Sequence, residues 1–361
     1  MNIVTARTKT KNYPVYIGEN LLSDTAIFKP HLTNNRVIIV SSELIAKLHL
    51  ELLCKTLEGY SVETILIEAG EQHKNLASIE KIIGMLAQQQ HDRFSTLISL
   101  GGGVIGDLTG FAASVFMRGL NLIHVPTTLL AQVDACIGGK TGFNHLGIKN
   151  MIGTFYQPTS VVIDSTLLKT LPQREYLSGL AEVLKYGMAC DAGFFCWLEE
   201  HAEALKRKDS TVLQIAIQRC CEIKLNIVYE DETDHAQRAV LNFGHTFAHA
   251  LESATNFSHY LHGEAVAIGM LHATWLGVKL GLVPQVLWDR LAILLQSLGL
   301  PSKYDRQLCS TFMLYSYILN DKKKNSRQLS LILPCALGKV KVFKDFDRQY
   351  LERLMEEYAI T

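Results

Sequence analysis

Proline is absent from a long central part of this chain, and this absence constrains the fold more than any other single feature. The chain has eight prolines, and none of them lies between residues 173 and 283. A proline removes an amide donor and clashes with the preceding turn, so helix interiors exclude it. In the same interval apolar residues recur at helical spacing, for example in EVLKYGMA and QIAIQRCCEIKLNIV. We therefore predict a mainly α-helical domain that begins after Leu171 and Pro172.

The part of the chain before Pro172 follows a different pattern, in which short β-branched runs alternate with helical segments. The candidate strands lie at residues 37–40, 62–67, 96–100, 122–125 and 161–164, and helical patterns cover residues 42–57 and 76–90. Strands that alternate with helices usually form a parallel sheet. A chain of 361 residues also exceeds the roughly 250–300 residues at which chains divide into two domains. We predict an α/β domain with a parallel, Rossmann-like sheet over residues 1–171, and a helical domain over residues 172–361.

The charge balance gives no electrostatic reason to expect nucleic acid or an anionic membrane as a partner, because 35 basic residues face 35 acidic ones. The first residues lack the apolar segment of a signal peptide, and the apolar stretch at 265–278 is too short to span a bilayer. The eight cysteines include no C-x-x-C pair, so we interpret them as reduced, buried thiols. We expect a soluble, cytoplasmic homodimer with a small-molecule substrate and with no nucleic-acid or membrane partner.

A glycine-rich run, GGGVIGDLTG, follows the third candidate strand directly. Gly101, Gly103 and Gly106 match G-x-G-x-x-G, a spacing that permits a tight turn, close approach of a pyrophosphate and close packing of helix on strand. The pattern alone is weak, since a strand–helix turn without a ligand can satisfy it. The extra glycine and Asp107 favour a nucleotide site. The run does not follow the first strand, and the acidic residue expected about 20 positions later is missing. We therefore predict a nucleotide bound across a different strand order.

Two further segments follow candidate strands and carry groups that could contact a nucleotide. In AGEQHK, Glu71 could hold ribose hydroxyls and Lys74 a phosphate, although the segment taken alone favours an ordinary solvated turn. Thr127 and Thr128 follow Pro126, where their hydroxyls could meet a phosphate or could cap a helix.

Histidines concentrate in one part of the helical region, where NFGHTFAHALE precedes LHGEAVAIGM. Asn242, His245, His249 and Glu252 are spaced three, four and three residues apart, which places them on one face of a single predicted helix. The HEXXH motif is absent, because Thr246 stands where that motif requires glutamate. This face is a candidate metal site, and the alternative is a set of buried histidines that bond to the backbone.

A carboxylate for such a site is available in GLAEVLKYG, where Lys185 follows Glu182 by one helical turn. A catalytic zinc usually has three protein ligands and one open position, and two histidines with one glutamate form an accepted set. The spacing does not decide which three residues would bind.

The motifs together resemble the 3-dehydroquinate synthase family, which belongs to the sugar-phosphate cyclase superfamily and acts in the shikimate pathway. The resemblance runs in order from about residue 71 to residue 322 and rests on the segments GGGVIGDLTGFAAS, RGLNLIHVPTTLLAQVDACIGGKTGFN, KNMIGTFYQP, GLAEVLKYG, RAVLNFGHTFAHALE and LHGEAVAIGM. It implies an N-terminal α/β domain that binds NAD and a C-terminal helical domain. It also implies one divalent metal, normally zinc, with cobalt as the alternative.

The resemblance also implies roles for individual residues. The implied metal ligands are Glu182, His245 and His262. The implied NAD contacts are Glu71, Lys74, Gly103, Val104, Ile105, Gly106, Asp107, Thr127 and Thr128, with Lys140 and Lys149 where cofactor and substrate meet. The implied substrate-side groups are Arg118, Asp134, Lys140, Lys185, Lys224, Arg238, Asn242, His249 and Lys322.

The implied reaction converts 3-deoxy-D-arabino-heptulosonate 7-phosphate to 3-dehydroquinate and phosphate. It proceeds by transient oxidation with NAD, elimination of phosphate, re-reduction, ring opening and an intramolecular aldol step. A substrate with a carboxylate and a phosphate explains why a chain without net charge would gather lysines and arginines at its site. His249 is the candidate proton relay, and a hydrogen bond to a metal ligand is the alternative role.

The chain departs from the family pattern at small residues beside the implied site. Ala69 replaces an aspartate, Ala135-Cys136-Ile137 replace S-S-V, and Ala248 replaces a glycine. Ser41-Ser42 occupy a turn where the family often has an acidic residue for the adenosine ribose, so the residue that holds this ribose is not assigned.

Two other activities share many of these features. A metal- and NAD-dependent polyol dehydrogenase would have the glycine run and the metal ligands, but it would not need so many cations. A different sugar-phosphate cyclase would act on a substrate without a carboxylate, and the family-like context of Arg238 and Lys322 argues against it.

Overall fold

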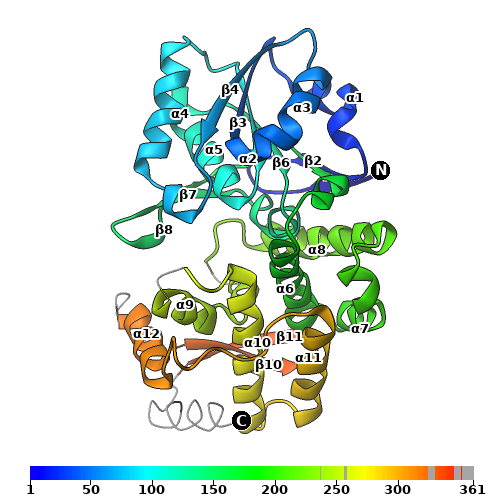
Figure 1. Cartoon of the computed structure of the whole chain (residues 1–361), viewed down its shortest axis with the longest axis vertical. Coiled ribbons are helices and arrows are strands. Elements are labelled where there is room, and N and C mark those ends of the chain that lie inside the picture. Colours follow the sequence, from blue (N-terminus) through cyan, green and yellow to red (C-terminus); the bar gives the residue numbers. More distant parts are fainter. Residues whose placement is uncertain (236, 256–257, 324–329, 345–350, 352–361) are drawn as a thin grey trace. The chain divides into compact units, whose positions relative to one another are not determined.

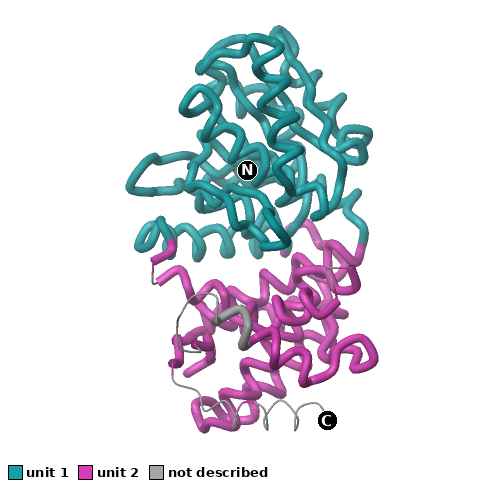
Figure 2. Tube along the Cα trace, turned by 90° about the vertical axis from the view of Figure 1, so that its left-hand side faces the viewer, with its two compact units in different colours: residues 1–172, 213–233 teal, residues 173–212, 234–361 magenta. Residues whose placement is uncertain are grey.

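The structure is a computed structural model, and it describes residues 1–235, 237–255, 258–323, 330–344 and 351. The chain divides into two compact units, which Figure 2 shows in different colours. Unit 1 comprises residues 1–172 and 213–233, and unit 2 comprises residues 173–212 and 234–361.

Unit 1 is built on a sheet that has seven strands among the described residues (Figure 1). The strands are β1 (Asn2–Ala6), β2 (Tyr13–Gly18), β3 (Arg36–Ser42), β4 (Ser61–Ile67), β5 (Thr96–Gly101), β6 (Asn121–Pro126) and β9 (Ser160–Asp164). Across the sheet their order is β1-β2-β9-β6-β5-β3-β4, with β1 and β2 antiparallel and all other neighbours parallel. The interior strand β5 is buried along its whole length. This is typical of a parallel strand whose two faces are both covered.

Helices and short turns connect these strands. The helices of unit 1 are α1 (Thr25–Phe28), α2 (Glu43–Ile45), α3 (Glu51–Thr56), α4 (Leu76–Gln88) and α5 (Gly103–Val115). The shorter helical turns are η1 (Leu21–Ser23), η2 (Lys29–His31), η3 (Ala46–Leu50), η4 (Glu71–His73), η5 (Phe116–Arg118), η6 (Ala131–Ala135) and η7 (Ser165–Lys169). A hairpin of β7 (Lys140–His145) and β8 (Ile148–Phe155) and most of α8 (Ser210–Glu230) complete the unit.

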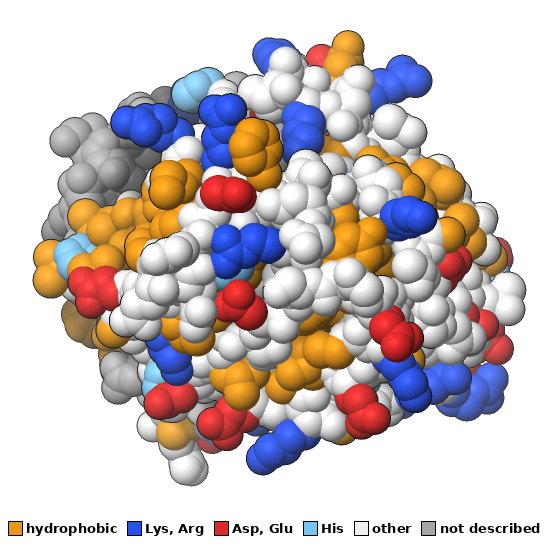
Figure 3. All heavy atoms as spheres, turned by 90° about the horizontal axis from the view of Figure 1, so that it is seen from above, with side chains coloured by type: hydrophobic (Ala, Val, Ile, Leu, Met, Phe, Trp, Pro, Cys, Tyr) orange, Lys and Arg blue, Asp and Glu red, His pale blue; other side chains and the backbone are white. Residues whose placement is uncertain are grey.

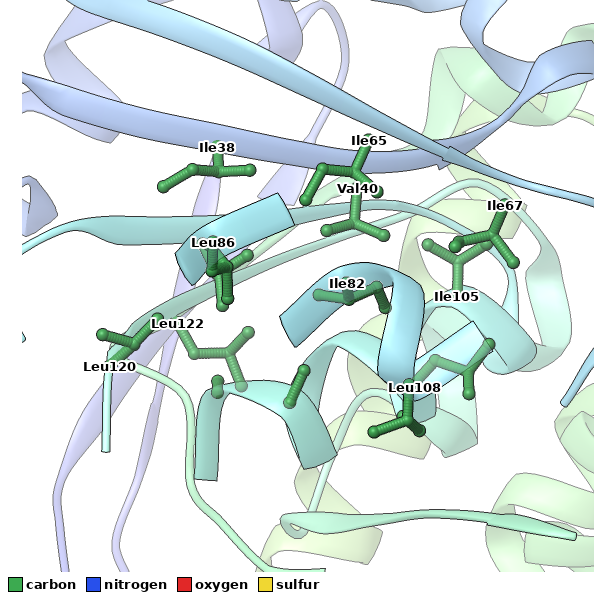
Figure 4. Packing of buried hydrophobic residues seen from close by; sticks show 14 of the residues in the cluster. Ile38, Val40, Ile65, Ile67, Ile82, Leu86, Ile105, Leu108, Leu120 and Leu122 are labelled. Carbon is green, nitrogen blue, oxygen red and sulfur yellow. The ribbon is translucent and has the colours of Figure 1, made fainter. Parts of the chain in front are cut away.

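Alternate residues of the central strands fill two separate hydrophobic cores, one on each face of the sheet. Ile38 and Val40 of β3 lie in the core that α4 and α5 cover, and Figure 4 shows this cluster. Val37 and Ile39 of the same strand lie in the core on the side of α3. This alternation follows from the period of two in a β-strand.

Unit 2 consists mainly of helices. They are α6 (Gln173–Cys190), α7 (Ala192–Lys206), α9 (His245–Ala254), α10 (His262–Lys279), α11 (Gln285–Leu298) and α12 (Thr311–Lys323), with the short turn η8 (Gln237–Asn242) before α9. A hairpin of β10 (Ser330–Ala336) and β11 (Lys339–Lys344) also belongs to this unit. Helix α10 lies at its centre, because α6, α9, α11 and β10 all contact it and most of its side chains are buried (Figure 1).

The predicted fold class is confirmed. The five strands expected in the first part correspond to β3, β4, β5, β6 and β9, and the helices expected after the first two of them are present. The hairpins β1–β2, β7–β8 and β10–β11 were not predicted. Among the described residues, no helix has the length and apolar character needed to cross a bilayer. On the face that Figure 3 shows, basic and acidic side chains are interspersed, in keeping with the even charge balance.

Candidate active site

Three helices of unit 2 bring one carboxylate and two imidazoles together. Glu182 comes from α6, His245 from the first residue of α9 and His262 from the first residue of α10. Glu182 Oε1 lies 3.8 Å from His245 Nε2 and 3.5 Å from His262 Nε2. One ligand atom from each residue lies within 4.8 Å of the others. The structure thus assembles the three residues that the family resemblance implied as metal ligands.

The start of α9 sits against α10 because two glycines allow it. Gly244 has a φ of +82°, a left-handed conformation at the residue directly before α9, which begins at His245. A Cβ atom on Gly269 of α10 would lie 2.2 Å from the carbonyl oxygen of Gly244. Any larger residue at position 269 would therefore separate the helices that carry His245 and His262.

Burial and the nearby charge of Lys185 favour the neutral form of His245. Lys185 Nζ lies 2.5 Å from Glu182 Oε2, and both side chains are almost completely buried. Burial lowers the pKa of His245 well below its ordinary value, and the positive charge of Lys185 lowers it further. A neutral imidazole is the form that binds a metal.

The residues present fit a divalent metal. Glu182 Oε1 is buried and accepts no hydrogen bond from the described residues, and the two imidazole nitrogens that face it are too far away to donate one. A buried carboxylate oxygen without a partner is costly. A Zn²⁺ or Co²⁺ ion bound by one carboxylate and two imidazoles would remove this cost and would match an accepted catalytic ligand set.

Two residues of α9 lie beside the three candidate ligands. The His249 ring is exposed, with its centroid 5.6 Å from that of His245 and 6.4 Å from that of His262. Glu252 is buried, and its Oε1 lies 3.2 Å from His262 Nδ1. Sequence reasoning placed Glu252 on the histidine face but gave it no role; the contact with His262 identifies one.

One prediction about this helix is wrong. Asn242 was expected on the same helical face as His245 and His249, but it ends η8 and is exposed. Phe243 and Gly244 separate it from α9, since the positive φ of Gly244 interrupts the helical path. Spacing alone did not detect this break.

Two cations proposed for substrate binding also belong to unit 2. Arg238 lies in η8 and is almost completely buried. Lys322 lies on the last turn of α12, and its side chain is outside the described part of the structure.

In unit 1 the glycine run forms the end of β5 and the start of α5. The first hydrogen bond of α5 runs from Gly106 N to Gly102 O at 3.0 Å, so the amides before Gly106 have no acceptor within the helix. The residues of this first part of the helix are Gly103, Val104, Ile105, Gly106 and Asp107. Free amides and the helix dipole at this end favour an anionic group such as a pyrophosphate.

The space around this helix start is narrow. A Cβ atom on Gly102 would lie 3.1 Å from Thr128 Cγ2. Thr127 N donates to Gly101 O at 3.0 Å, and the buried Thr127 Oγ1 has no partner among the described residues. Thr128 Oγ1 accepts from Ala131 N at 3.2 Å, which is the predicted helix-capping role. The unpartnered hydroxyl and the small residues around it fit a bound nucleotide.

Lys74 and Glu71 hold the segment after β4 to neighbouring elements. The buried Lys74 Nζ donates to Asp107 Oδ2 and to Asn150 Oδ1, each at 2.5 Å. Glu71 Oε1 accepts from Asn144 Nδ2 at 2.9 Å. Burial raises the pKa of Asp107, and the charge of Lys74 opposes this rise. These residues therefore join η4, α5 and the β7–β8 hairpin into one arrangement.

The remaining candidates of unit 1 lie in different surroundings. The buried Lys224 Nζ donates to the Asp134 carbonyl oxygen at 2.7 Å and also pairs with the Asp134 carboxylate. Arg118 is exposed and has a φ of +65°, next to Met117 at +48°. Lys140 is exposed at the start of β7, and Lys149 is half-buried on β8.

Two family models match consecutive parts of the chain. The model for the 3-dehydroquinate synthase N-terminal domain matches residues 64–178, and the model for the C-terminal domain matches residues 179–324. A 3-dehydroquinate synthase of Pseudomonas aeruginosa is 46% identical over 342 residues, which cover 95% of this chain and 93% of the relative. Another, from Hydrogenovibrio crunogenus, is 43% identical and covers 99% of this chain and 100% of the relative.

Solved structures resemble the whole chain. A 2-epi-5-epi-valiolone synthase from Streptomyces hygroscopicus, solved with NAD⁺ and Zn²⁺, has a TM-score of 0.88 at 28% identity, with 99% of each chain covered. A 2-deoxy-scyllo-inosose synthase, solved with carbaglucose-6-phosphate, NAD⁺ and Co²⁺, also has a TM-score of 0.88 with 99% of each chain covered. Its identity of 23% supports a shared fold only.

Proposed function

This chain belongs to the 3-dehydroquinate synthase family, and on that basis we propose a role in the reaction for each candidate site residue. The enzyme is a lyase of the shikimate pathway, and it converts 3-deoxy-D-arabino-heptulosonate 7-phosphate to 3-dehydroquinate and phosphate. NAD and one divalent metal are its cofactors. The observation that carries this function is the meeting of Glu182, His245 and His262 in unit 2, beside the buried Lys185.

In our proposal Glu182, His245 and His262 hold the metal. When bound, a Zn²⁺ or Co²⁺ ion polarises the substrate hydroxyl and lowers its pKa. Lys185 balances the charge of Glu182 and, through its own charge, helps to keep His245 neutral. His249 lies beside the ligands and is exposed, so it can exchange protons with solvent as the proposed relay.

Unit 1 supplies the proposed NAD site. NAD held there would supply the acceptor for a substrate hydride and, once reduced, the hydride donor. The amides at the start of α5 would hold the pyrophosphate, with Thr127 Oγ1 as an additional donor. The hydrogen bond between Lys74 and Asp107 would hold the segment after β4 against the start of α5. Glu71 would accept hydrogen bonds from ribose hydroxyls. Lys140 and Lys149 complete the proposed contacts of this unit.

The substrate carries two anionic ends, a carboxylate and a phosphate, and the proposed substrate residues are mostly cations. Unit 1 supplies Arg118, Asp134, Lys140 and Lys224, and unit 2 supplies Lys185, Arg238, Asn242, His249 and Lys322. Arginine can bind a carboxylate or a phosphate through two parallel hydrogen bonds, whereas lysine acts as a point charge. Positioning of the reactive ends of the substrate contributes most at the ring-closing step.

We also propose that the enzyme is a homodimer. Apolar side chains are exposed in η5, directly after α5, and on β8: Met117 is 57%, Met151 55% and Phe155 45% exposed. Helix α5 and strand β8 are adjacent, because Thr154 Oγ1 donates to Ser114 Oγ at 2.8 Å. Exposed apolar groups gathered in this way are typical of an interface. Light scattering should report twice the chain mass, and Phe155→Lys should shift the protein toward the monomer.

The cytoplasm is the compartment that we propose. None of the eight cysteines, all of them within the described residues, forms a disulfide. Reduced thiols in this number are typical of a reducing compartment. Fractionation of the native cells, followed by immunodetection, would test this assignment.

A phosphate-release assay tests the proposed function. The purified enzyme, with NAD and the seven-carbon keto acid phosphate, should release one phosphate for each substrate consumed. A chelator should abolish this release, and added Zn²⁺ or Co²⁺ should restore it. Unchanged release after complete removal of the metal would contradict the proposed role of Glu182, His245 and His262.

A further inference from the structure

The backbone that carries His262 is held firmly to α6. Gly263 N donates to Ser178 Oγ at 3.0 Å, and a Cβ atom on Gly263 would lie only 1.8 Å from Ser178 O. Arg174 bonds both carboxylate oxygens of Glu264, each at 2.7 Å. Glu264 also accepts from Leu261 N at 2.9 Å. These contacts fix the backbone at the start of α10. Only the side-chain torsion angles of His262 can then change the direction in which its imidazole points.

Packing alone does not orient this imidazole, because the His262 side chain is 30% exposed. One carboxylate lies near each of the two ring nitrogens of His262. Glu252 Oε1 is 3.2 Å from Nδ1, and Glu182 Oε1 is 3.5 Å from Nε2. The Glu252 contact is within hydrogen-bond distance, and Glu182 is already neutralised by Lys185.

The contact with Glu252 determines which nitrogen carries the proton. With Glu252 in its ionised form the carboxylate can only accept a hydrogen bond, which makes His262 Nδ1 the donor and leaves the lone pair on Nε2. That lone pair faces Glu182 Oε1, where the ligand atoms of the three residues meet.

His245 has the same arrangement with a different acceptor. Its Nδ1 lies 3.2 Å from the carbonyl oxygen of Phe243, which also can only accept, and its Nε2 faces Glu182. In both histidines, Nδ1 is hydrogen-bonded to an acceptor and Nε2 faces the carboxylate of Glu182. The backbone supplies the acceptor for His245, and a side chain supplies it for His262.

We propose that Glu252 is a positioning residue that sets the tautomer and the ring orientation of His262 for metal binding. This inference rests on the proposed function, because it takes Glu182, His245 and His262 as the metal ligands. An acceptor behind a ligating histidine fixes its tautomer and raises its basicity, and its loss typically weakens metal affinity about 10–100-fold.

The test measures the Zn²⁺ dissociation constant of the metal-free enzyme by competition with a chromophoric chelator. Glu252→Met removes the acceptor but keeps a similar length and an apolar group in a buried position, so it should fold. Glu252→Gln keeps an acceptor oxygen. We expect Glu252→Met to weaken Zn²⁺ binding about 10–100-fold and Glu252→Gln to retain most of the affinity.

Glu232→Gln is the matched control, because Glu232 is also a buried carboxylate, and its partners are Lys9, Thr10 and Gln157 of unit 1. This variant should bind Zn²⁺ as the wild type does. Thermal unfolding of all metal-free proteins checks that each variant is folded.

The outcomes separate the two claims. If the wild type binds no Zn²⁺, the proposed function fails. If the wild type binds Zn²⁺ and Glu252→Met binds it equally well, the role of Glu252 is wrong. Equal losses in Glu252→Met and Glu252→Gln would assign the effect to the charge at position 252 and not to the hydrogen-bond acceptor, which also contradicts the proposal.

Discussion

Lys185 and Glu182 form a buried ion pair in α6, with Nζ 2.5 Å from Oε2. The pair places a positive charge next to the one carboxylate that both candidate histidine ligands face. In the absence of a metal this lysine therefore balances the carboxylate, and its removal should have a larger effect on the metal-free enzyme than on the loaded one.

Lys185→Met should destabilise the metal-free enzyme by about 3–5 kcal/mol, because it leaves the buried charge of Glu182 without its partner. Added Zn²⁺ should raise the unfolding free energy of this variant more than that of the wild type. Denaturant unfolding with and without Zn²⁺ measures both effects. Lys81→Met, at an exposed position of α4, should change stability by no more than about 0.5 kcal/mol. If Lys185→Met changes the unfolding free energy as little as Lys81→Met does, the Lys185–Glu182 pair does not contribute to stability.

Gly263→Ala should weaken the contact between α6 and α10. The added Cβ would lie 1.8 Å from a backbone oxygen of Ser178, so one of the helices must move. We expect a loss of stability of about 1–3 kcal/mol and weaker Zn²⁺ binding, since Glu182 and His262 sit on the two helices. Gly84→Ala is the control, because no atom lies within 4 Å of the new Cβ, and it should stabilise α4 by about 0.4–1 kcal/mol. A Gly263→Ala enzyme with wild-type stability and Zn²⁺ affinity would contradict this account of the helix contact.

The stability of the enzyme should fall on acidification below about pH 6.5. Burial lowers the pKa of His124 and of His272 from 6.5 to about 4. Between these values the unfolded chain binds more protons than the folded one, so the unfolding free energy decreases as the pH falls. The loss should reach about 3 kcal/mol for each histidine by pH 4.

Denaturant unfolding across this pH range measures the effect. His272→Phe should show a shallower loss than the wild type, whereas His259→Phe, at an exposed position, should follow the wild type. The same acid dependence in all three proteins would show that the buried His272 does not contribute.

Arg238→Ala should reduce kcat/KM for phosphate release by an amount equivalent to about 2–5 kcal/mol, because it removes a buried cation proposed to hold an anionic end of the substrate. Steady-state kinetics with the keto acid phosphate measures this change. Arg93→Ala, at an exposed position of unit 1, should leave the kinetics unchanged. Wild-type kinetics in Arg238→Ala would remove this residue from the proposed substrate site.

The parts of the fold that the sequence predicts are those with strong local patterns. Apolar β-branched runs identified β3, β5, β6 and β9, because these strands are buried on both faces, and they also identified the edge strand β4, which buries Ile65 and Ile67. The hairpins escaped prediction for physical reasons. β1 is mostly exposed, β2 contains Pro14, and β7 and β8 contain Gly142 and Gly153, which strand patterns disfavour.

The candidate site was predictable in its chemistry but not in its geometry. Histidine spacing identified His245 and His249 and the sequence offered Glu182 as a carboxylate, but only the family resemblance grouped Glu182, His245 and His262 as one candidate ligand set. Spacing also placed Asn242 on α9, because a sequence pattern does not reveal the left-handed φ of Gly244. The role of Glu252 depends on a contact between helices, which no single segment encodes.

Turnover with substoichiometric NAD tests the central claim most directly, because a cyclase reduces and reoxidises its NAD within each catalytic cycle. With the wild-type enzyme, Zn²⁺ and far less NAD than keto acid phosphate, we predict that phosphate release continues until the substrate is consumed. One phosphate should appear for each substrate molecule, and the absorbance of NADH should not rise steadily. NADH that accumulates in proportion to the substrate consumed, without release of phosphate, would contradict the account and would identify a dehydrogenase.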